Sequence, residues 1–595
     1  MAPPDFPSAK LTLSYPLYAC DFDPQDPTRL VVGGGGGAGR SGVGNKITVL
    51  NSPTPDDLIV AGEADLSRDE DSVSSLAVGP RKGKSTLVYA GINSSPAELA
   101  KGKNEHLRVF SVESTKTRAA AGAAVPSANV SELSRTALFS ATHPEEYQRL
   151  LRLGAPSSSG TQLGAAASGL GKDHEIALFE VSPTGSVVPK SKGKVELTRQ
   201  ADDIDLLQTG EDSYQLAYCH EYEIYTVGVV KGKGEDPKLV FTTPHNEGTG
   251  APRAQFRCIR YLTPNFILAI ANLPKRSGVL LQGIRLPTKD GENGRVAITT
   301  KLPKRVGQAT ALAVSNLTPP TSPGAKIDRV QFLIAVAGHD SSISLYTLEH
   351  KFIQTISVLF ELFPLHTIKD AHPLQITGLA FSPFTAPKTS GNTRPLAIKL
   401  ASISMVNTVV VHSIPLKKFV DKSAPARRGG PPRPVRYIVA AKSTNPATKP
   451  LIISLSVIVL ILAIVAQALL EIVGSSPPIL GASKYFNPYG TLRNPQDEFI
   501  NRVLGDVPRS THQNVVLREE PVLTGDDGVQ IQAGVDYDEA QGKASSWDEL
   551  TTKQKELWKE KLREQGYWAE KMGEDVFRGV LFGQIAGAIG QAVGG

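Results

Sequence analysis

The sequence predicts an all-β protein: a seven-bladed, WD-repeat-like β-propeller, followed by one transmembrane helix and a small, partly helical tail. Three observations support this. Short alternating strands recur at intervals of roughly 45–70 residues, slightly above the spacing of four-stranded blades. An almost uncharged stretch then begins near residue 451. The composition becomes mixed beyond that stretch. We therefore assign residues 1–414 to the propeller.

The repeated pattern is a polar or small turn that leads into an alternating strand. Its seven occurrences begin at Asn45, Glu105, Asp173, His220, Ser277, Asp340 and Asn407. Residues 376–383, ITGLAFSP, are typical of the opening of a WD-repeat blade. The Trp-Asp dipeptide itself is absent before residue 415, so the blades are degenerate. An array of β-sandwiches is the alternative fold. We expect the low-complexity stretches at 118–130 and 155–169 to be disordered loops.

The transmembrane helix is predicted at residues 451–473. About 20 apolar residues at 1.5 Å each span roughly 30 Å, the thickness of a bilayer's hydrocarbon core. Residues 415–450 are rich in Pro, Lys and Arg, and Asp421 is their one acid, which indicates an extended basic linker. Because basic residues concentrate on the cytoplasmic side of a span, the propeller is expected to be cytosolic.

The remaining residues, 474–595, form the lumenal tail in this arrangement. A capping box at Ser546 and a narrow apolar stripe predict an amphipathic helix near 546–572. The first residues have no apolar run, so we expect no cleavable signal peptide. The chain is therefore expected to insert through its own anchor, as a single-pass type II membrane protein.

Composition excludes several classes of function. The net charge of +6 is small for this length and argues against nucleic acid as a partner. The three cysteines have neither the spacing of a zinc site nor that of a disulfide framework. No constellation of Ser, His and Asp supports an enzyme with its active site in the propeller channel.

One segment stands apart: residues 33–46, GGGGGAGRSGVGNK. Each ordered glycine costs roughly 0.5–1 kcal/mol of extra chain entropy, so such a run is unfavourable in a strand. It is typical of backbone that presents bare carbonyls and amides, or of a floppy loop tip. Residues 37–42 match Gly-x-Gly-x-x-Gly, but a strand follows where the dinucleotide fingerprint needs a helix. We therefore expect this chain to bind no nucleotide.

Several of these segments resemble a known family. They are Tyr-Pro-Leu-Tyr at 15–18, the glycine-rich loop ending in Asn45-Lys46, Asn-Glu-His-Leu-Arg at 104–108, and Ala371-His372. Together with one span after a propeller, they resemble the Sec-twelve family. These are endoplasmic-reticulum membrane guanine-nucleotide exchange factors for the Sar-type small GTPase that starts COPII coat assembly. The resemblance covers roughly residues 15–473, and the tail matches nothing in it.

The resemblance implies a mechanism without bond chemistry, in which a loop pushes into the nucleotide-switch region of the GTPase. Asn45 matches the exchange-promoting asparagine of the family. The loop residues implied to contact the GTPase are Gly36, Gly37, Ala38, Gly39, Arg40, Ser41, Gly42, Val43 and Gly44, with Asp71 beside them. A potassium ion is implied on the backbone carbonyls of Gly34, Gly35, Gly36 and Gly37.

Two departures qualify the resemblance. Ala38 stands where the family usually has an acid, which removes side-chain help for the ion. Gly44 stands where the family often has proline, which makes the loop less rigid. Residues 69–72, Asp-Glu-Asp-Ser, match an acidic stretch beside the partner surface, and each is expected to lie in a solvated turn. We expect Asn45→Ala to leave the melting temperature nearly unchanged and to slow GDP release.

The implied location is the endoplasmic reticulum membrane, with cycling to the Golgi. The implied partners are the Sar-type GTPase, that membrane and COPII coat proteins. The alternative function is a membrane-anchored propeller adaptor that recruits trafficking proteins without exchange activity. The glycine-rich loop separates the two functions, because an adaptor has no need of such backbone.

Overall fold

A computed structural model describes most of residues 6–439 and selected parts of the remainder. The gaps in the first range are 40, 119–123, 141–144, 245–252, 290, 354–355, 388–395, 421–434 and parts of 321–328. Further described residues are 448–473, 477, 479–486, 515–519, 529–533 and 552–564. The chain divides into two compact units, Met1–Ala441 and Lys442–Gly595, and each is described by itself.

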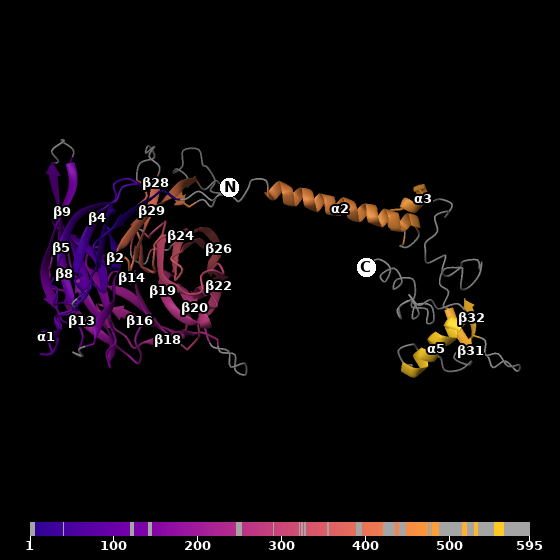
Figure 1. Ribbon diagram of the computed structural model, residues 1–595, viewed down its shortest axis with the longest axis horizontal. Helices are drawn as coiled ribbons and strands as arrows, with labels where there is room; N and C mark the ends of the chain where they lie inside the picture. Colours follow the sequence, from indigo (N-terminus) through magenta and orange to yellow (C-terminus); the bar gives the residue numbers. More distant parts are fainter. Residues whose placement is uncertain are drawn as a thin grey trace. The chain divides into compact units, whose positions relative to one another are not determined.

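The first unit is a seven-bladed β-propeller, as predicted, built from seven antiparallel sheets (Figure 1). Blade 1 contains β2 (Leu17–Asp23), β3 (Asp26–Gly34), β4 (Lys46–Asn51) and β5 (Ile59–Asp65). Blade 2 contains β6 (Ser75–Lys82), β7 (Ser85–Gly91), β8 (Leu107–Arg118) and β9 (Ala124–Thr136), with α1 (Pro96–Leu99) between β7 and β8. Blade 3 contains β10 (Tyr147–Leu153), β11 (Gln162–Gly169), β12 (His174–Val181) and β13 (Lys190–Leu197).

The next three blades continue in chain order. Blade 4 contains β14 (Asp203–Gly210), β15 (Ser213–His220), β16 (Glu223–Val230), β17 (Lys233–Gly234) and β18 (Lys238–Thr242). Blade 5 contains β19 (Gln255–Thr263), β20 (Phe266–Asn272), the short helix η1 (Pro274–Arg276), β21 (Val279–Arg285) and β22 (Arg295–Lys301). Blade 6 contains β23 (Ala309–Asn316), β24 (Val330–Gly338), β25 (Ile343–Ile353) and β26 (Ile356–Ile368).

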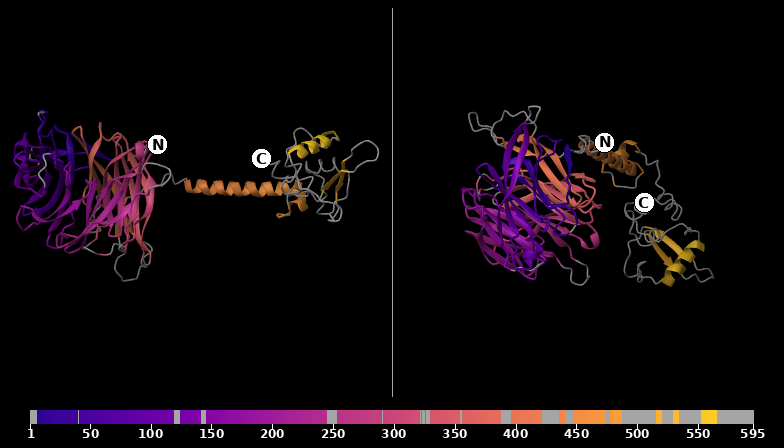
Figure 2. Two further views of the ribbon diagram at one scale, coloured as in Figure 1. Left: turned by 90° about the horizontal axis from the view of Figure 1, so that it is seen from below. Right: turned by 60° about the vertical axis from the view of Figure 1, so that its left-hand side comes forward.

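Blade 7 closes the ring by combining the two ends of the unit. It contains β27 (Ile376–Phe381), β28 (Leu396–Ser404), β29 (Thr408–Val420) and β1 (Ser8–Thr12) from the N-terminus. The register pairs Ser8 with His412 and Thr12 with Thr408. The first strands of all seven blades line a central cavity of about 280 Å³, as in a closed propeller. Figure 2 shows the sheets of this unit from two further directions.

The seven occurrences of the predicted repeat fall on the third strand of each blade: β4, β8, β12, β16, β21, β25 and β29. The polar residue before the strand forms the turn from the second strand. Glu221, Ser341 and Asn407 take φ values of 41°, 58° and 62° there. Few side chains tolerate such backbone angles. The repeat found in the sequence is therefore this polar turn residue together with the alternating strand that follows it.

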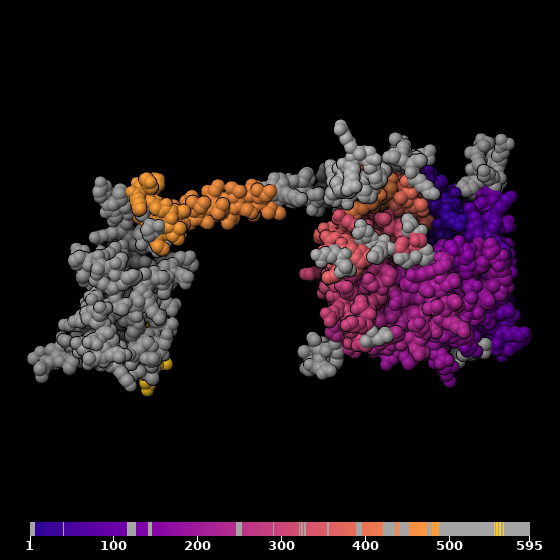
Figure 3. Space-filling model, turned by 180° about the vertical axis from the view of Figure 1, so that it is seen from behind, coloured from indigo at the N-terminus to yellow at the C-terminus, as the bar shows by residue number. Residues whose placement is uncertain are grey.

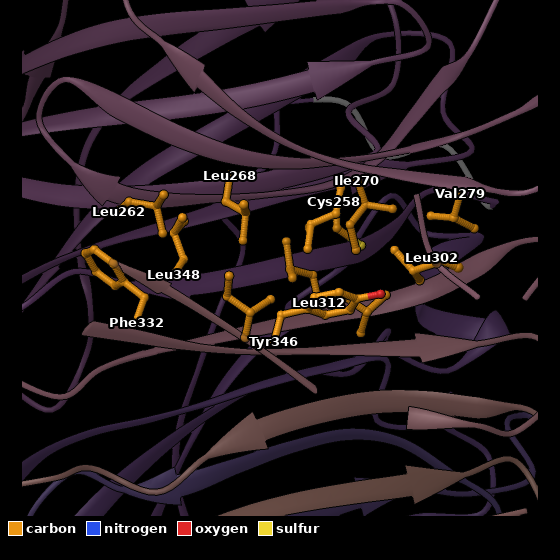
Figure 4. Packing of buried hydrophobic residues seen from close by; sticks show 14 of the residues in the cluster. Cys258, Leu262, Leu268, Ile270, Val279, Leu302, Leu312, Phe332, Tyr346 and Leu348 are labelled. Atoms are coloured by element: carbon orange, nitrogen blue, oxygen red, sulfur yellow. The ribbon is translucent and has the colours of Figure 1, made fainter. Parts of the chain in front are cut away.

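The hydrophobic core lies between neighbouring blades. In one cluster, Leu268 and Ile270 of β20 and Phe332 of β24 are among the buried side chains that join blades 5 and 6 (Figure 4). Burying side chains of this kind stabilises the fold by about 1.5–3 kcal/mol each. The same arrangement recurs around the ring, so each blade is held by both of its neighbours.

Two expected disordered loops instead contain strands. β8 and β9 cover most of residues 118–130, apart from the undescribed 119–123. β11 lies within 155–169 and is buried along its whole length. Its small residues allow close packing: a Cβ added at Gly164 would lie 2.3 Å from the Phe179 ring. A buried strand of Ala and Gly has the composition of a low-complexity loop, which explains the incorrect expectation.

The propeller unit also ends later than residue 414. β29 continues to Val420, and β30 (Val435–Ile438) pairs with its final residues. The guanidinium of Arg436 lies 4.8 Å from the centre of the Phe419 ring, and Val439 N donates to Gln331 Oε1 at 2.8 Å. The predicted linker is therefore partly strand, because its apolar residues have partners in blades 6 and 7. Residues 421–434 and 440–447 of the linker lie outside the described part.

The second unit begins with α2 (Thr448–Val473), which contains one stretch, Ile452–Ile472, long and apolar enough to cross a membrane (Figure 3). Its other described elements are α3 (Ala482–Phe486), β31 (Val515–Glu519), β32 (Val529–Ala533) and α5 (Thr552–Glu564). The described part of the predicted amphipathic helix near 546–572 is α5. The remainder of that prediction lies outside the described residues.

Two buried histidines predict how stability depends on pH. Burial lowers the pKa of His106 and of His372 to about 4. The unfolded chain, with histidine pKa values near 6.5, therefore binds more protons than the folded one between these values. We expect the unfolding free energy, measured by denaturant titration, to be fully present above pH 6.5 and to fall toward pH 4. His372→Asn should flatten this dependence, and an unchanged slope would contradict the assignment.

Candidate functional site

The glycine-rich loop connects β3 to β4, the second and third strands of blade 1. Strands alternate in direction within a blade, so this loop shares a propeller face with the connections between blades. Its neighbours on that face are the β5–β6 connection at 66–74 and the β7–β8 connection at 92–106. Hydrogen bonds join all three, including Leu66 N to Asn45 O at 2.9 Å and Asp71 N to Asn93 O at 3.2 Å.

The base of the loop is closely packed. A Cβ added at Gly34 would lie 1.9 Å from the carbonyl oxygen of Pro16. At Gly35, which has a φ of 145°, a Cβ would lie 2.6 Å from the Cα of Asn45. Such separations are far below van der Waals contact, so both positions require glycine. The base is thus a tight structural element rather than a floppy tip.

Asn45 determines how the loop folds. Its side chain is 1% exposed, and its amide group makes three hydrogen bonds. Oδ1 accepts from Gly37 N at 2.9 Å, while Nδ2 donates to the carbonyls of Ser67 and Glu70 at 3.1 and 2.8 Å. The amide therefore joins the loop to the β5–β6 connection. Losing buried hydrogen bonds of this kind costs about 1–3 kcal/mol. Asn45→Ala should therefore lower the melting temperature, contrary to the expectation from the sequence.

Glu70 is buried, although its segment was expected to be a solvated turn. Its carboxylate contacts two guanidinium groups, Arg108 Nη1 at 2.5 Å and Arg135 Nη1 at 2.6 Å. Arg108 has no solvent exposure, and its Nε and Nη2 have no hydrogen-bond partner in the described residues. Burial alone would raise the pKa of Glu70. The hydrogen bonds and positive charges of Arg108 and Arg135 together lower it by more, so the pKa lies below its usual range.

Sequence reasoning missed this ion-pair cluster. One signal was available: Arg108 shares a face of its strand with Phe110 and Val112, which are both apolar and buried. A guanidinium in such a strand needs an acidic partner. The sequence does not identify the partner, because Glu70 is 38 residues away.

The predicted GTPase-contacting residues divide into two groups. Ala38, Gly39, Ser41 and Gly42 form an exposed tip, and Gly36, Gly37, Val43 and Gly44 are half-buried. Arg40 lies outside the described residues. Asp71 does lie beside the loop: its Oδ1 is 3.1 Å from where a Cβ of Gly37 would stand. The structure thus brings the predicted residues together, and their contact with a partner stays a prediction.

Other residues that carried the resemblance hold the blades together. Tyr15 Oη and Thr48 Oγ1 form a buried hydrogen bond of 2.7 Å. His106 Nε2 accepts from the backbone of Leu138, so its protonated Nδ1 donates to Gln148. His372 contacts hydroxyl groups of β28 and β29 through both ring nitrogens. These positions are structural.

The proposed ion ligands are not equivalent. Gly34 belongs to β3 and pairs with both neighbouring strands. The carbonyl oxygens of Gly35, Gly36 and Gly37 receive no hydrogen bond from any described residue. Backbone carbonyls without hydrogen-bond partners are the kind of ligand that a monovalent cation takes in proteins. In the described residues, no cluster of three or more His, Cys, Asp or Glu side chains could hold a metal.

These features define a class: a β-propeller that presents a fixed, glycine-rich loop from one face, with an apolar helix long enough to span a membrane after it. No protein-family model matches the chain. The guanine nucleotide-exchange factor SEC12 of Candida glabrata is 24% identical over 380 residues, covering 62% of this chain and 67% of that protein. The chain resembles the SEC12 exchange factors.

Solved structures with similar folds include Sqt1 of Saccharomyces cerevisiae, with 11% identity and a TM-score of 0.38 over 69% of this chain and all of that one. A chain of the COPII outer coat vertex on membranes has 10% identity and a TM-score of 0.39, covering 73% of this chain and 91% of its own length.

Proposed function

We propose that this protein is a guanine-nucleotide exchange factor for a Sar-type small GTPase. The single observation that carries the proposal is the glycine-rich loop, whose base is fixed by Asn45 while its tip is exposed. The similarity to SEC12 supports it. A loop that is already ordered loses little conformational entropy when it binds a partner, which favours its insertion into the GTPase.

The loop acts by differential binding. An exchange factor accelerates release when it binds the nucleotide-free GTPase better than the loaded form. Backbone groups at the exposed tip, Ala38, Gly39, Ser41 and Gly42, would contact the switch region. Asn45 and Glu70 hold the tip in place from below. In this mechanism Asn45 is a positioning residue, because its amide is already occupied within the chain.

Nucleotide release from the GTPase tests the function. The full chain in proteoliposomes should accelerate GDP release, measured with a fluorescent nucleotide. A soluble fragment that ended at Ser413 would be unsuitable for this assay, because it would lack the second half of β29. Asn45→Ala should slow release at least tenfold, which needs only about 1.4 kcal/mol of lost stabilisation.

The control is Asn51→Ala, at the other end of β4, because the Asn51 amide oxygen has no partner in the described residues. Asn51→Ala should keep its activity. If the wild-type chain binds the GTPase without accelerating release, the protein is instead a recruiting adaptor.

Potassium is part of the proposal. The carbonyls of Gly35, Gly36 and Gly37 would hold the ion, and the Asp71 carboxylate would add charge where Ala38 offers no side-chain oxygen. Bound potassium would stiffen the loop by holding these carbonyls together. We expect exchange to slow when sodium or lithium replaces potassium at equal ionic strength. Equal activity in all three salts would reject the ion and leave the loop fixed by Asn45 alone.

The proposed place of action is the endoplasmic reticulum membrane, where the GTPase would start COPII coat assembly. The proposed orientation places the propeller in the cytosol, from the basic residues before α2. Protease added to sealed microsomes should then digest the propeller and spare a fragment that begins near residue 451. Protection of the propeller would reverse this orientation.

A further inference from the structure

The last turn of α2 contains an unusual charge. Glu471 is the one ionisable residue of the apolar stretch Ile452–Ile472, and it is 2% exposed. A carboxylate is costly at the end of a membrane span unless hydrogen bonds satisfy it. The groups that hydrogen-bond to Glu471 therefore indicate the role of the residues that follow α2.

Backbone amides of the following segment satisfy this carboxylate. Leu480 N donates to Glu471 Oε1 at 2.6 Å, and Ala482 N donates to Oε2 at 2.9 Å. Gln467, one turn earlier in α2, donates to Oε1 at 3.3 Å. Gly481 takes a φ of 70°, which permits the chain to turn into α3. Glu471 thus holds residues 479–486 against the end of α2, where Figure 1 shows α3.

This segment exposes large apolar side chains. Ile479, Tyr485 and Phe486 are 75%, 83% and 75% exposed, and Leu480 is 48% exposed. The apolar side chains of α2, which α3 contacts, are exposed as well. Aromatic residues gather at membrane–water interfaces, and a lysine such as Lys484 can extend its charge into water from there.

We propose that residues 479–486 form an interfacial anchor that lies in the headgroup region of the bilayer, held there by Glu471. The surface that covers the four apolar side chains is lipid, because they adjoin the end of the apolar helix. The inference rests on the proposed membrane span and is independent of exchange activity. The anchor would fix the depth of α2 and keep its final carboxylate away from hydrocarbon.

Fluorescence quenching by brominated lipids tests the anchor in the full chain, reconstituted into phosphatidylcholine vesicles. Phe486→Trp reports on the anchor, Leu460→Trp on the span, and Ile353→Trp on an exposed apolar site of the propeller. The signal of the three native tryptophans is subtracted using the parent chain. Phe486→Trp should be quenched by lipids brominated near the headgroup and should emit at shorter wavelength than Ile353→Trp.

Adding Glu471→Ala to Phe486→Trp should lower the quenching toward that of Ile353→Trp. Quenching of Leu460→Trp without quenching of Phe486→Trp would overturn the anchor and leave the span intact. Absence of quenching at both positions would overturn the span itself. Undiminished quenching of Phe486→Trp in the Glu471→Ala background would remove Glu471 from the proposal.

Discussion

Gly35→Ala is expected to abolish exchange activity. The new Cβ would stand 2.6 Å from the Cα of Asn45 and 2.1 Å from its Oδ1, at a φ of 145°. Backbone strain of this kind costs about 1–3 kcal/mol before the clash is counted. The loop must then move away from Asn45, which breaks the hydrogen bond to Gly37. We expect GDP release to slow by at least a hundredfold, equivalent to about 2.7 kcal/mol.

Gly44→Ala is the matched control for this variant. It makes the same chemical change in the same loop, outside the exposed tip that is proposed to contact the GTPase. No described atom lies within 4 Å of the added Cβ, and φ is not in the left-handed range. Its exchange rate should remain close to that of the parent. If both variants were equally active, the shape of the loop would not matter for exchange. If both were equally inactive, general stiffening rather than the contact with Asn45 would be responsible.

Glu70→Gln is expected to give the largest loss of stability. It removes the negative charge between Arg108, which has no exposure, and Arg135. Breaking a buried pair by removing one partner costs about 3–5 kcal/mol, because the remaining charge is left uncompensated. The unfolding free energy should fall by this amount in a denaturant titration at pH 7. Exchange should fall as well, since the Glu70 carbonyl also holds Asn45.

The neighbouring acid supplies the control, because Asp69 is exposed and Asp69→Asn makes the same change of charge. The effect of pH provides a second check. The pKa of Glu70 is lowered in the folded state, so its stabilisation is present above its unfolded pKa and is lost as the pH falls through the folded value. The stability difference between parent and Glu70→Gln should therefore shrink in acid. A difference that stayed constant down to pH 2 would show that packing, not charge, is responsible.

Local patterns predicted the propeller well. Each blade has a third strand preceded by a polar turn, and both features depend on residues close together in the sequence. Strands that depend on distant contacts were harder to predict. The Ala and Gly residues of β11 carry little strand propensity, and burial between two strands determines their structure. β30 likewise depends on contacts with blades 6 and 7 that no local pattern contains.

The candidate site, like the fold, could be predicted from the sequence only in part. The sequence identified the loop through its glycines and identified Asn45 at its end. It did not show that the Asn45 amide is buried, because Ser67 and Glu70, which accept its hydrogen bonds, lie 22 and 25 residues further along. The cluster joins Glu70 of the β5–β6 connection to Arg108 and Arg135 of blade 2, which are 38 and 65 residues away, so no local pattern contains it.

The pairing of β1 with β29 makes the timing of synthesis important. β1 is among the first residues to leave the ribosome, yet its partner follows about 400 residues later. Closing a loop of that length costs roughly 5 kcal/mol by loop entropy alone, so the ring must form late, after most blades have packed. Until then β29 keeps an unpaired edge that another chain can bind. A chain that stops before Thr408 never gains β29, so premature termination there should yield an open ring prone to aggregation.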